Sequence, residues 1–257
     1  MAQYMAKVIT IINQKGGVGK TTTAQSIGVW IQVKKNKKVL FLDLDQQGNL
    51  TYALGAGNSD YNTLEVLETG LIRADKAQLT PSGFSVIPST PSLAHVDVVL
   101  TQTGKEYRLK EALEGLDEYD FVIMDTPPSL NIITINALTA SDYAIIPAQA
   151  DIFSLQGITQ LGQTIETVKR YTNKNLIVLG IVLTKHSTRS ILSRDLKNVI
   201  ANTAIHLHTN VYKEYIREAV AIRESQAMKK DIFSYNPNSN AALDYDALMK
   251  QIWKDIK

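Results

Sequence analysis

The chain has no cysteine among its 257 residues, and this absence removes several kinds of site at once. Disulfide bonds, thiolate zinc sites and iron–sulfur clusters all depend on cysteine sulfur. Such a composition fits a reducing cytosol. We therefore expect a cytosolic protein that is not built around an iron–sulfur cluster.

Long apolar segments are also missing from the sequence. No apolar run reaches the roughly 18 residues that a membrane-spanning helix needs, and residues 1–7 lack the apolar core of a signal peptide. We therefore expect the protein to stay in the cytoplasm.

The sequence also has no large excess of positive or negative charge. It contains 27 Lys and Arg residues and 25 Asp and Glu residues, which gives a net charge of +2. A bulk charge of this size does not mark a nucleic-acid-binding protein. Any binding of that kind must come from local basic patches or from the pairing of two subunits.

Two common catalytic patterns are absent. The histidines, at positions 95, 186, 206 and 208, include no pair four residues apart with an intervening Glu, so a zinc site is not indicated. No Gly-x-Ser-x-Gly segment occurs, so a serine hydrolase is not indicated either.

Short apolar runs alternate with segments of helical periodicity along the chain. The runs are mostly continuous, as in strands that are covered on both faces. They occupy residues 8–12, 39–42, 84–87, 121–124, 143–146 and 176–183. Helical spacing occurs over residues 22–34, 106–116, 155–171 and 190–201. The alternation predicts an α/β fold with a doubly wound, mostly parallel sheet flanked by helices on both faces.

The most informative segment follows the first predicted strand, over residues 13–22, and reads Asn-Gln-Lys-Gly-Gly-Val-Gly-Lys-Thr-Thr. Glycines let successive backbone N–H groups converge on a phosphate, and the next helix adds unpaired N–H donors and the positive end of its dipole. In such a loop Lys20 reaches the β- and γ-phosphates, and the hydroxyl of Thr21 binds Mg²⁺. The sequence therefore predicts a nucleotide and Mg²⁺ site formed by Gly16, Gly17, Val18, Gly19, Lys20, Thr21 and Thr22.

This phosphate loop begins at residue 13, which leaves no room for an N-terminal DNA-binding domain. No internal repeat, low-complexity tract or Pro/Gly/Ser-rich linker marks a domain boundary. We expect residues 1–257 to form a single P-loop ATPase domain.

Carboxylates follow two of the predicted strands. Asp43 and Asp45 come after residues 39–42, and Asp125 comes after residues 121–124. The carboxyl ends of strands in a doubly wound sheet form the ligand crevice, so these acids can meet the phosphate loop. An Asp after a strand is also a common turn or cap residue. Because two strands end this way in a chain with a phosphate loop, we favour a site that holds Mg²⁺ and places a water molecule.

The string from Lys15 to Thr21 resembles the deviant Walker A motif, KGGxGKT, of the ParA/MinD superfamily of ATPases. The general phosphate-loop pattern has glycine five positions before Gly19, where this chain has Gln14 followed by Lys15. In that superfamily the first lysine crosses a dimer interface to the phosphates of the partner's nucleotide. The resemblance implies ATP as the cofactor and a homodimer in the ATP state, with Lys15 and Lys20 both serving catalysis.

Further segments resemble signatures of the same superfamily. Residues 43–49 read Asp-Leu-Asp-Gln-Gln-Gly-Asn, which implies that Asp45 orients the attacking water and that Asp43 supports the Mg²⁺ shell. Residues 125–129 resemble the Walker B segment, which implies that Asp125 holds Mg²⁺ through water. Two more segments resemble those that frame the adenine, which implies contacts from Thr184, Asn236 and Pro237.

Basic side chains form three groups. The first, over residues 34–38, closes the helix after the phosphate loop, where cations complement the helix dipole. The others occupy residues 189–197 and 217–230, and a solvated helix face is an alternative explanation for both. Residues 216–227 resemble the stretch from which partition ATPases contact DNA non-specifically. The resemblance implies DNA contacts from Arg189, Arg217, Arg223 and Lys230.

Together these resemblances predict a DNA partition ATPase of the small ParA/Soj type that associates with the nucleoid. ATP binding would form a sandwich dimer that coats double-stranded DNA. A centromere-binding partner of the ParB type would trigger hydrolysis, which is slow in the ATPase alone.

Two alternatives stay open. A MinD-like ATPase would lie on a membrane through its C-terminal helix. Residues 242–257 carry three Asp against three Lys and lack the cationic bias that anionic lipid requires, so we expect their apolar face to pack on the sheet and do not favour a membrane partner. A metabolic ATP-dependent enzyme of the same superfamily would need a substrate pocket that the sequence does not locate.

Overall fold

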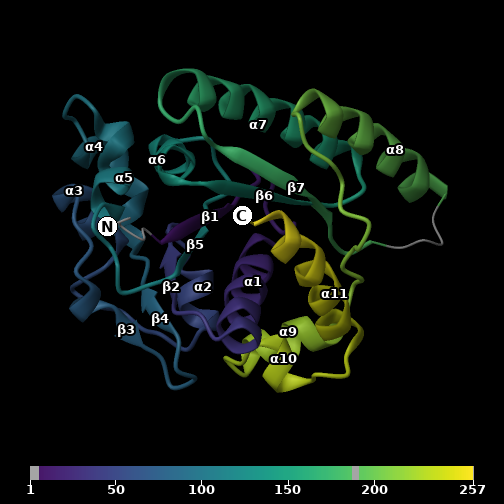
Figure 1. Ribbon diagram of the computed structural model, residues 1–257, viewed down its shortest axis with the longest axis horizontal. Coiled ribbons are helices and arrows are strands. Elements are labelled where there is room, and N and C mark those ends of the chain that lie inside the picture. The colour runs from purple at the N-terminus through teal and green to yellow at the C-terminus, as the bar shows by residue number, and fades with distance from the viewer. Residues whose placement is uncertain (1–5, 187–190, 257) are drawn as a thin grey trace.

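The computed structural model describes residues 6–186 and 191–256, without the side chains of residues 191–198. These residues form a seven-stranded sheet in the order β3-β4-β2-β5-β1-β6-β7 (Figure 1). All neighbouring strands pair in parallel except β3 and β4. The strands are β1 Lys7–Ile11, β2 Val39–Asp43, β3 Gln78–Leu79, β4 Ser85–Ile87, β5 Phe121–Asp125, β6 Tyr143–Ala148 and β7 Ile177–Leu183. The α/β fold class predicted from the sequence is confirmed.

Helices cover both faces of the sheet (Figure 1). One face packs on α1 Lys20–Lys35 and on α11 Asn240–Asp255, with α2 Asn49–Ala53, α9 Val220–Ala227 and α10 Ile232–Tyr235 beside them. The other face is covered by α3 Thr63–Thr69, α4 Val96–Val99, α5 Arg108–Leu113, α6 Ile132–Ala140, α7 Ile152–Tyr171 and α8 Ile191–His206. The described residues also contain three short 3₁₀ turns, at Ala74–Lys76, Pro91–His95 and Lys105–Tyr107. The continuous apolar runs are explained by this arrangement, because successive strand residues enter cores on opposite faces.

Helix α1 approaches the sheet closely, and this contact fixes the helix that follows the phosphate loop. A Cβ atom added at Gly28 would lie 2.3 Å from the ring of Phe41 on β2. Glycine is therefore required at this position by close packing rather than by backbone conformation.

The structure differs from the prediction at the ends of helices and also in short helices that the sequence did not predict. The helix predicted over residues 106–116 is shorter, because a 3₁₀ turn precedes α5. The helix predicted from residue 155 begins at Ile152, where the side chain of Asp151 caps its N-terminus. The sequence did not predict α6, because this helix is apolar on nearly all sides and shows no helical periodicity.

The C-terminal helix α11 packs into the protein. Leu248 and Ile252 are fully buried, and Trp253 contacts the rings of Trp30 and Phe121. The apolar face of this helix is therefore used inside the fold, as predicted. In the part of the chain that the structure describes, no helix combines the length and apolar character needed to cross a membrane.

Candidate nucleotide-binding site

The phosphate loop joins β1 to α1 at the carboxyl edge of the sheet. Gly17 and Gly19 have φ angles of 74° and 86°, in the left-handed region that favours glycine. Helix α1 begins directly after Gly19, at Lys20. The unpaired N–H groups of its first turn therefore lie beside the loop, which is the arrangement that binds phosphate groups.

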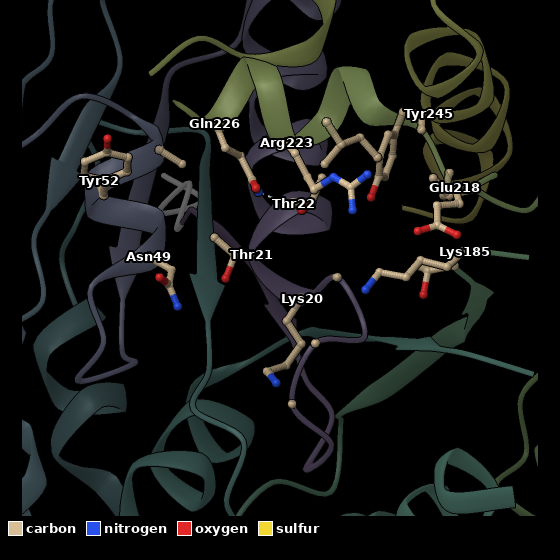
Figure 2. A pocket seen from close by; sticks show the side chains of 18 of the residues that line it. Lys20, Thr21, Thr22, Asn49, Tyr52, Lys185, Glu218, Arg223, Gln226 and Tyr245 are labelled. Carbon is tan, nitrogen blue, oxygen red and sulfur yellow. Dashed lines mark hydrogen bonds between the residues drawn. The ribbon is translucent and has the colours of Figure 1, made fainter. Parts of the chain in front are cut away.

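A cavity of about 560 Å³ lies against this loop, a volume typical of small-molecule sites (Figure 2). Figure 2 shows Lys20 and Thr21 toward one end of the cavity. Lys185, Glu218, Arg223 and Tyr245 lie toward the other end. The cavity can therefore hold phosphates at the loop and a larger ligand group opposite.

Lys20 is held within the loop. Its Nζ atom donates a hydrogen bond to the backbone oxygen of Lys15 at 3.1 Å, and only 7% of the residue is exposed. Burial lowers the pKa of Lys20, while the carboxylates of Asp125 and Asp45 act in the opposite direction. A phosphate group beside this ammonium would stabilise its positive charge, which burial disfavours.

Asp125 and Thr21 form the part of the site that fits a divalent cation. The Thr21 hydroxyl donates to Oδ2 of Asp125 at 2.6 Å. Oδ1 of Asp125 is buried and has no hydrogen-bond partner among the described residues. Burial raises the pKa of Asp125 well above its usual value, and the neighbouring Asp43 raises it further. An orphaned carboxylate oxygen beside a hydroxyl is a donor set that suits Mg²⁺.

Asp43 lies next to Asp125 across the paired strands β2 and β5. Its Oδ2 atom accepts hydrogen bonds from both the N–H and the hydroxyl of Thr51, each at 2.7 Å, and its Oδ1 atom accepts from the N–H of Asp45 at 3.2 Å. Burial raises the pKa of Asp43 to about 6 against these hydrogen bonds. Asp43 therefore anchors the segment that carries Asp45, and its part in a Mg²⁺ shell stays a prediction.

Asp45 lies on the wall of the cavity. Its Oδ1 atom accepts the N–H of Gln47 at 3.1 Å, and the hydroxyl of Ser89 donates to its backbone oxygen. These bonds fix the residue, which is only 7% exposed. The position is compatible with a carboxylate that orients a water molecule, and that role also stays a prediction.

The first lysine of the loop, Lys15, does not lie on the cavity wall. Its Nζ atom forms an ion pair with Asp151, the residue that caps α7. In the isolated chain, therefore, the ammonium of Lys15 is paired with a carboxylate, whereas that of Lys20 donates to a backbone oxygen.

Contacts with the adenine were predicted for Thr184, Asn236 and Pro237, and these roles stay predictions. Thr184 does line the cavity, and its hydroxyl donates to the backbone oxygen of Val18 at 2.7 Å. Asn236 and Pro237, by contrast, are not among the lining residues. Asn236 instead ends α10, with its N–H bonded to the oxygen of Ile232.

Residues 216–219 line the end of the cavity opposite the loop. The chain returns along β7 after α8, so that Ile216 donates to the oxygen of Leu183 at 2.8 Å and accepts from the N–H of His186 at 3.0 Å. This pairing carries Glu218 and Ala219 to the cavity wall, where Ile222 and Tyr245 join them. Resemblance assigned residues 216–227 to DNA contact, and nothing in the sequence connected residues 216–219 with the nucleotide cavity.

Two of the predicted DNA-contact residues line the cavity, and DNA contact by them stays a prediction. Arg217 lines the cavity and makes a bidentate ion pair with Asp244 of α11, with NH2–Oδ1 at 2.6 Å and Nε–Oδ2 at 2.9 Å. Arg223 also lines the cavity, whereas Lys230 is exposed just beyond α9. Arg189 lies outside the described residues, as do the side chains of Arg194 and Lys197.

Comparison with known proteins places this site in a family. Residues 6–178 match the AAA domain family. The sporulation initiation inhibitor protein Soj of Bacillus subtilis is 39% identical over 96% of this chain and 98% of its own length. The chromosome partitioning protein ParA of Caulobacter vibrioides is 36% identical over 98% of this chain and 96% of its own.

Solved structures agree. Cobyrinic acid a,c-diamide synthase from Mycobacterium smegmatis, with bound ADP and magnesium, has a TM-score of 0.80 and 33% identity over 98% of this chain and 97% of that one. A putative plasmid partition protein from Borrelia burgdorferi, bound to AMPPNP, has a TM-score of 0.81 and 25% identity over 98% of this chain and 100% of that one. With its deviant phosphate loop, its two strand-end carboxylates and these relatives, the chain belongs to the ParA/MinD family of P-loop ATPases.

Proposed function

We propose that the protein is an ATP-dependent DNA partition ATPase of the ParA/Soj type. The orphaned Oδ1 atom of buried Asp125, beside the Thr21 hydroxyl and the phosphate loop, supports the ATP and Mg²⁺ site. The similarity to Soj of Bacillus subtilis and ParA of Caulobacter vibrioides supports the partition role. A buried carboxylate with an unpaired oxygen is costly unless a cation completes it. ATP with Mg²⁺ supplies both that cation and the phosphates that would neutralise Lys20.

Within this proposal Thr21 and Asp125 hold Mg²⁺, and Asp43 supports them from the neighbouring strand. The metal ion would neutralise charge on the phosphates. Gly16, Gly17, Val18, Gly19 and Thr22 bind the phosphates through backbone N–H groups at the start of α1. Asp45 orients the attacking water. Thr184 and residues 216–219 enclose the base.

The homodimer is the second part of the proposal. Lys15 has a long side chain of which 24% is exposed, so it can leave its own subunit without disturbing the core. A lysine that reaches the phosphates of a second subunit makes dimer formation depend on ATP. Hydrolysis then removes the phosphate that both subunits share and separates them.

DNA binding is the third part. Arg189, Arg217, Arg223 and Lys230 would contact backbone phosphates without reading sequence, and two subunits would double the contacts. A net charge of +2 per chain is sufficient on those terms. A ParB-type partner bound at a centromere would stimulate hydrolysis, and the protein would be found on the nucleoid.

Co-sedimentation with DNA and, separately, with liposomes tests the proposal. The protein is mixed with plasmid DNA or with anionic liposomes, in Mg²⁺ with ATP or with ADP, and the pellet is assayed. We expect pelleting with DNA in ATP but not in ADP, and none for Lys20→Ala, which removes the main counter-charge of the phosphates. Pelleting with liposomes alone would instead support a MinD-like protein.

A metabolic ATP-dependent enzyme is the second candidate, because one structural relative at 33% identity is described as a diamide synthase. The same experiment addresses it, since such an enzyme would pellet with neither surface. A MinD-like role has weaker support, because the apolar face of α11 is buried within the fold.

A further inference from the structure

Hydrogen bonds join the first part of the phosphate loop to the end of β6 and to the connection between β6 and α7. The side chain of Asn13 donates to the backbone oxygen of Pro147 at 2.7 Å, and the side chain of Gln149 donates to the oxygen of Gly17 at 3.2 Å. Lys15 continues this line of contacts, because its Nζ atom reaches Asp151 at 2.5 Å and the hydroxyl of Ser154 at 3.4 Å. The backbone around Lys15 is therefore fixed, and its ammonium group is held by side chains at the start of α7.

Asp151 serves two partners with its two oxygens. Oδ1 accepts the N–H of Ser154 at 2.8 Å and so caps α7, while Oδ2 accepts the ammonium of Lys15. Partial burial raises the pKa of Asp151, but the hydrogen bonds from Lys15 and Ser154 outweigh this effect, and the net pKa lies below the usual value. Asp151 is therefore ionised and paired at neutral pH.

This pair is partly open to solvent. The Lys15 and Asp151 side chains are 24% and 34% exposed, so the ion pair can break without unpacking the protein. The flexible four-carbon stem of a lysine side chain allows its ammonium to swing while the loop stays in place. Among the described residues Lys15 thus has one carboxylate partner, which it is free to exchange for another anion.

We propose that Asp151 is a positioning residue that retains Lys15 on its own subunit and thereby sets how readily ATP pairs two chains. The inference rests on the proposed function, in which Lys15 crosses to the partner's phosphates. Asp151 and the partner's phosphates then compete for the ammonium group of Lys15. A symmetric dimer must open two such pairs, so each pair adds to the ATP-dependent threshold for association.

Removal of the carboxylate charge tests this inference. Asp151→Asn keeps an N-cap side chain but removes the ion pair, and Asp151→Ser is a second capping variant for the same purpose. Dimerisation is measured by analytical ultracentrifugation in Mg²⁺ with AMPPNP. Exposed ion pairs are weak, so we expect the dimer dissociation constant to fall by about two- to fivefold for each pair released. Asp151→Glu, which keeps the charge, should behave as the unaltered protein.

A matched control removes the same charge elsewhere. Asp120→Asn breaks the Lys37–Asp120 ion pair of 2.9 Å, which lies at the amino ends of β2 and β5. This variant should leave the dimer dissociation constant unchanged. A second readout needs no dimer. The rate at which an N-hydroxysuccinimide ester acylates Lys15, followed by mass spectrometry without nucleotide, should rise in Asp151→Asn while that of Lys37 does not change.

The outcomes separate the two proposals. If the unaltered chain stays monomeric with AMPPNP, the proposed function fails and the inference fails with it. If that chain dimerises but Asp151→Asn and Asp151→Ser dimerise equally well or less well, the inference alone is overturned. Unchanged acylation of Lys15 would also contradict it.

Discussion

At the scale of single residues, the site is defined by which polar groups have partners and which do not. Lys20 and Asp125 are both buried, yet among the described residues neither forms the close ion pair that burial normally requires. Asp43 is equally buried but fully engaged by Thr51 and Asp45. Lys20 and Asp125 therefore fit groups that bind a ligand, whereas Asp43 fits a group that stabilises the local backbone.

Asp45 is the residue at which hydrolysis can be separated from binding. We expect Asp45→Ala to keep ATP-dependent dimers and to lower turnover by about a hundredfold or more, because water would no longer have the group that orients it. Phosphate release and ultracentrifugation in ATP measure the two properties. Asp97→Ala, at an exposed position away from the cavity, is the control. A mutant that stays monomeric in ATP would show that Asp45 acts in assembly instead.

The residues of the phosphate loop were predictable because the chemistry is local. Glycines, a lysine and a hydroxyl within ten consecutive positions need no tertiary contact to be recognised. The base-contact prediction at Asn236 and Pro237 is less well supported, because these residues do not line the cavity. Their place in space depends on how α9, α10 and α11 fold back on α1, which no short motif specifies.

At the scale of elements, α1 connects the loop to the core. Its N-terminus carries the phosphate-binding groups, and Gly28, in the middle of the helix, lies against Phe41 of β2. Any change that lifts α1 from the sheet also displaces the loop. Stability and nucleotide binding are therefore coupled through this helix.

Gly28→Ala tests that coupling. Alanine favours a helix by about 1 kcal/mol over glycine, but its Cβ would lie 2.3 Å from the Phe41 ring. We expect a net decrease of about 1–2 kcal/mol in the free energy of unfolding, because overpacking outweighs the propensity gain. Urea unfolding measures it. Gly57→Ala, which has no atom within 4 Å of its added Cβ, is the matched control. A stabilised Gly28→Ala variant would mean that α1 can shift without cost.

At the scale of the whole molecule, the nucleotide cavity and the predicted DNA-contact residues share one segment. Arg217 lines the cavity and is tied to Asp244 on α11, so this segment joins the nucleotide site to the C-terminal helix. The sequence analysis offered DNA contact or a solvated helix face for these basic residues. The structure places two of its arginines at the cavity, because the chain pairs along β7 before it enters α9.

Arg217→Ala should weaken DNA binding of the ATP dimer equally across sequences. The slope of log affinity against log salt should fall in magnitude by about one unit for each DNA phosphate that the variant no longer neutralises. Asp244→Asn provides the matched control, because it breaks the ion pair but keeps the arginine. ATP affinity is measured for both variants. An equal weakening of DNA binding in the two would assign Arg217 to the support of residues 216–219 rather than to DNA.

The sequence by itself determined the α/β class, the phosphate loop and the strand-end carboxylates, since each depends on residue type and spacing along a short stretch. Tertiary structure decided three other matters. It brought residues 216–219 to the cavity, and it formed the ion pairs of Arg217 with Asp244 and of Lys15 with Asp151. Each of these contacts joins residues far apart in the chain, and only the strand order and helix packing of the folded protein bring them within bonding distance.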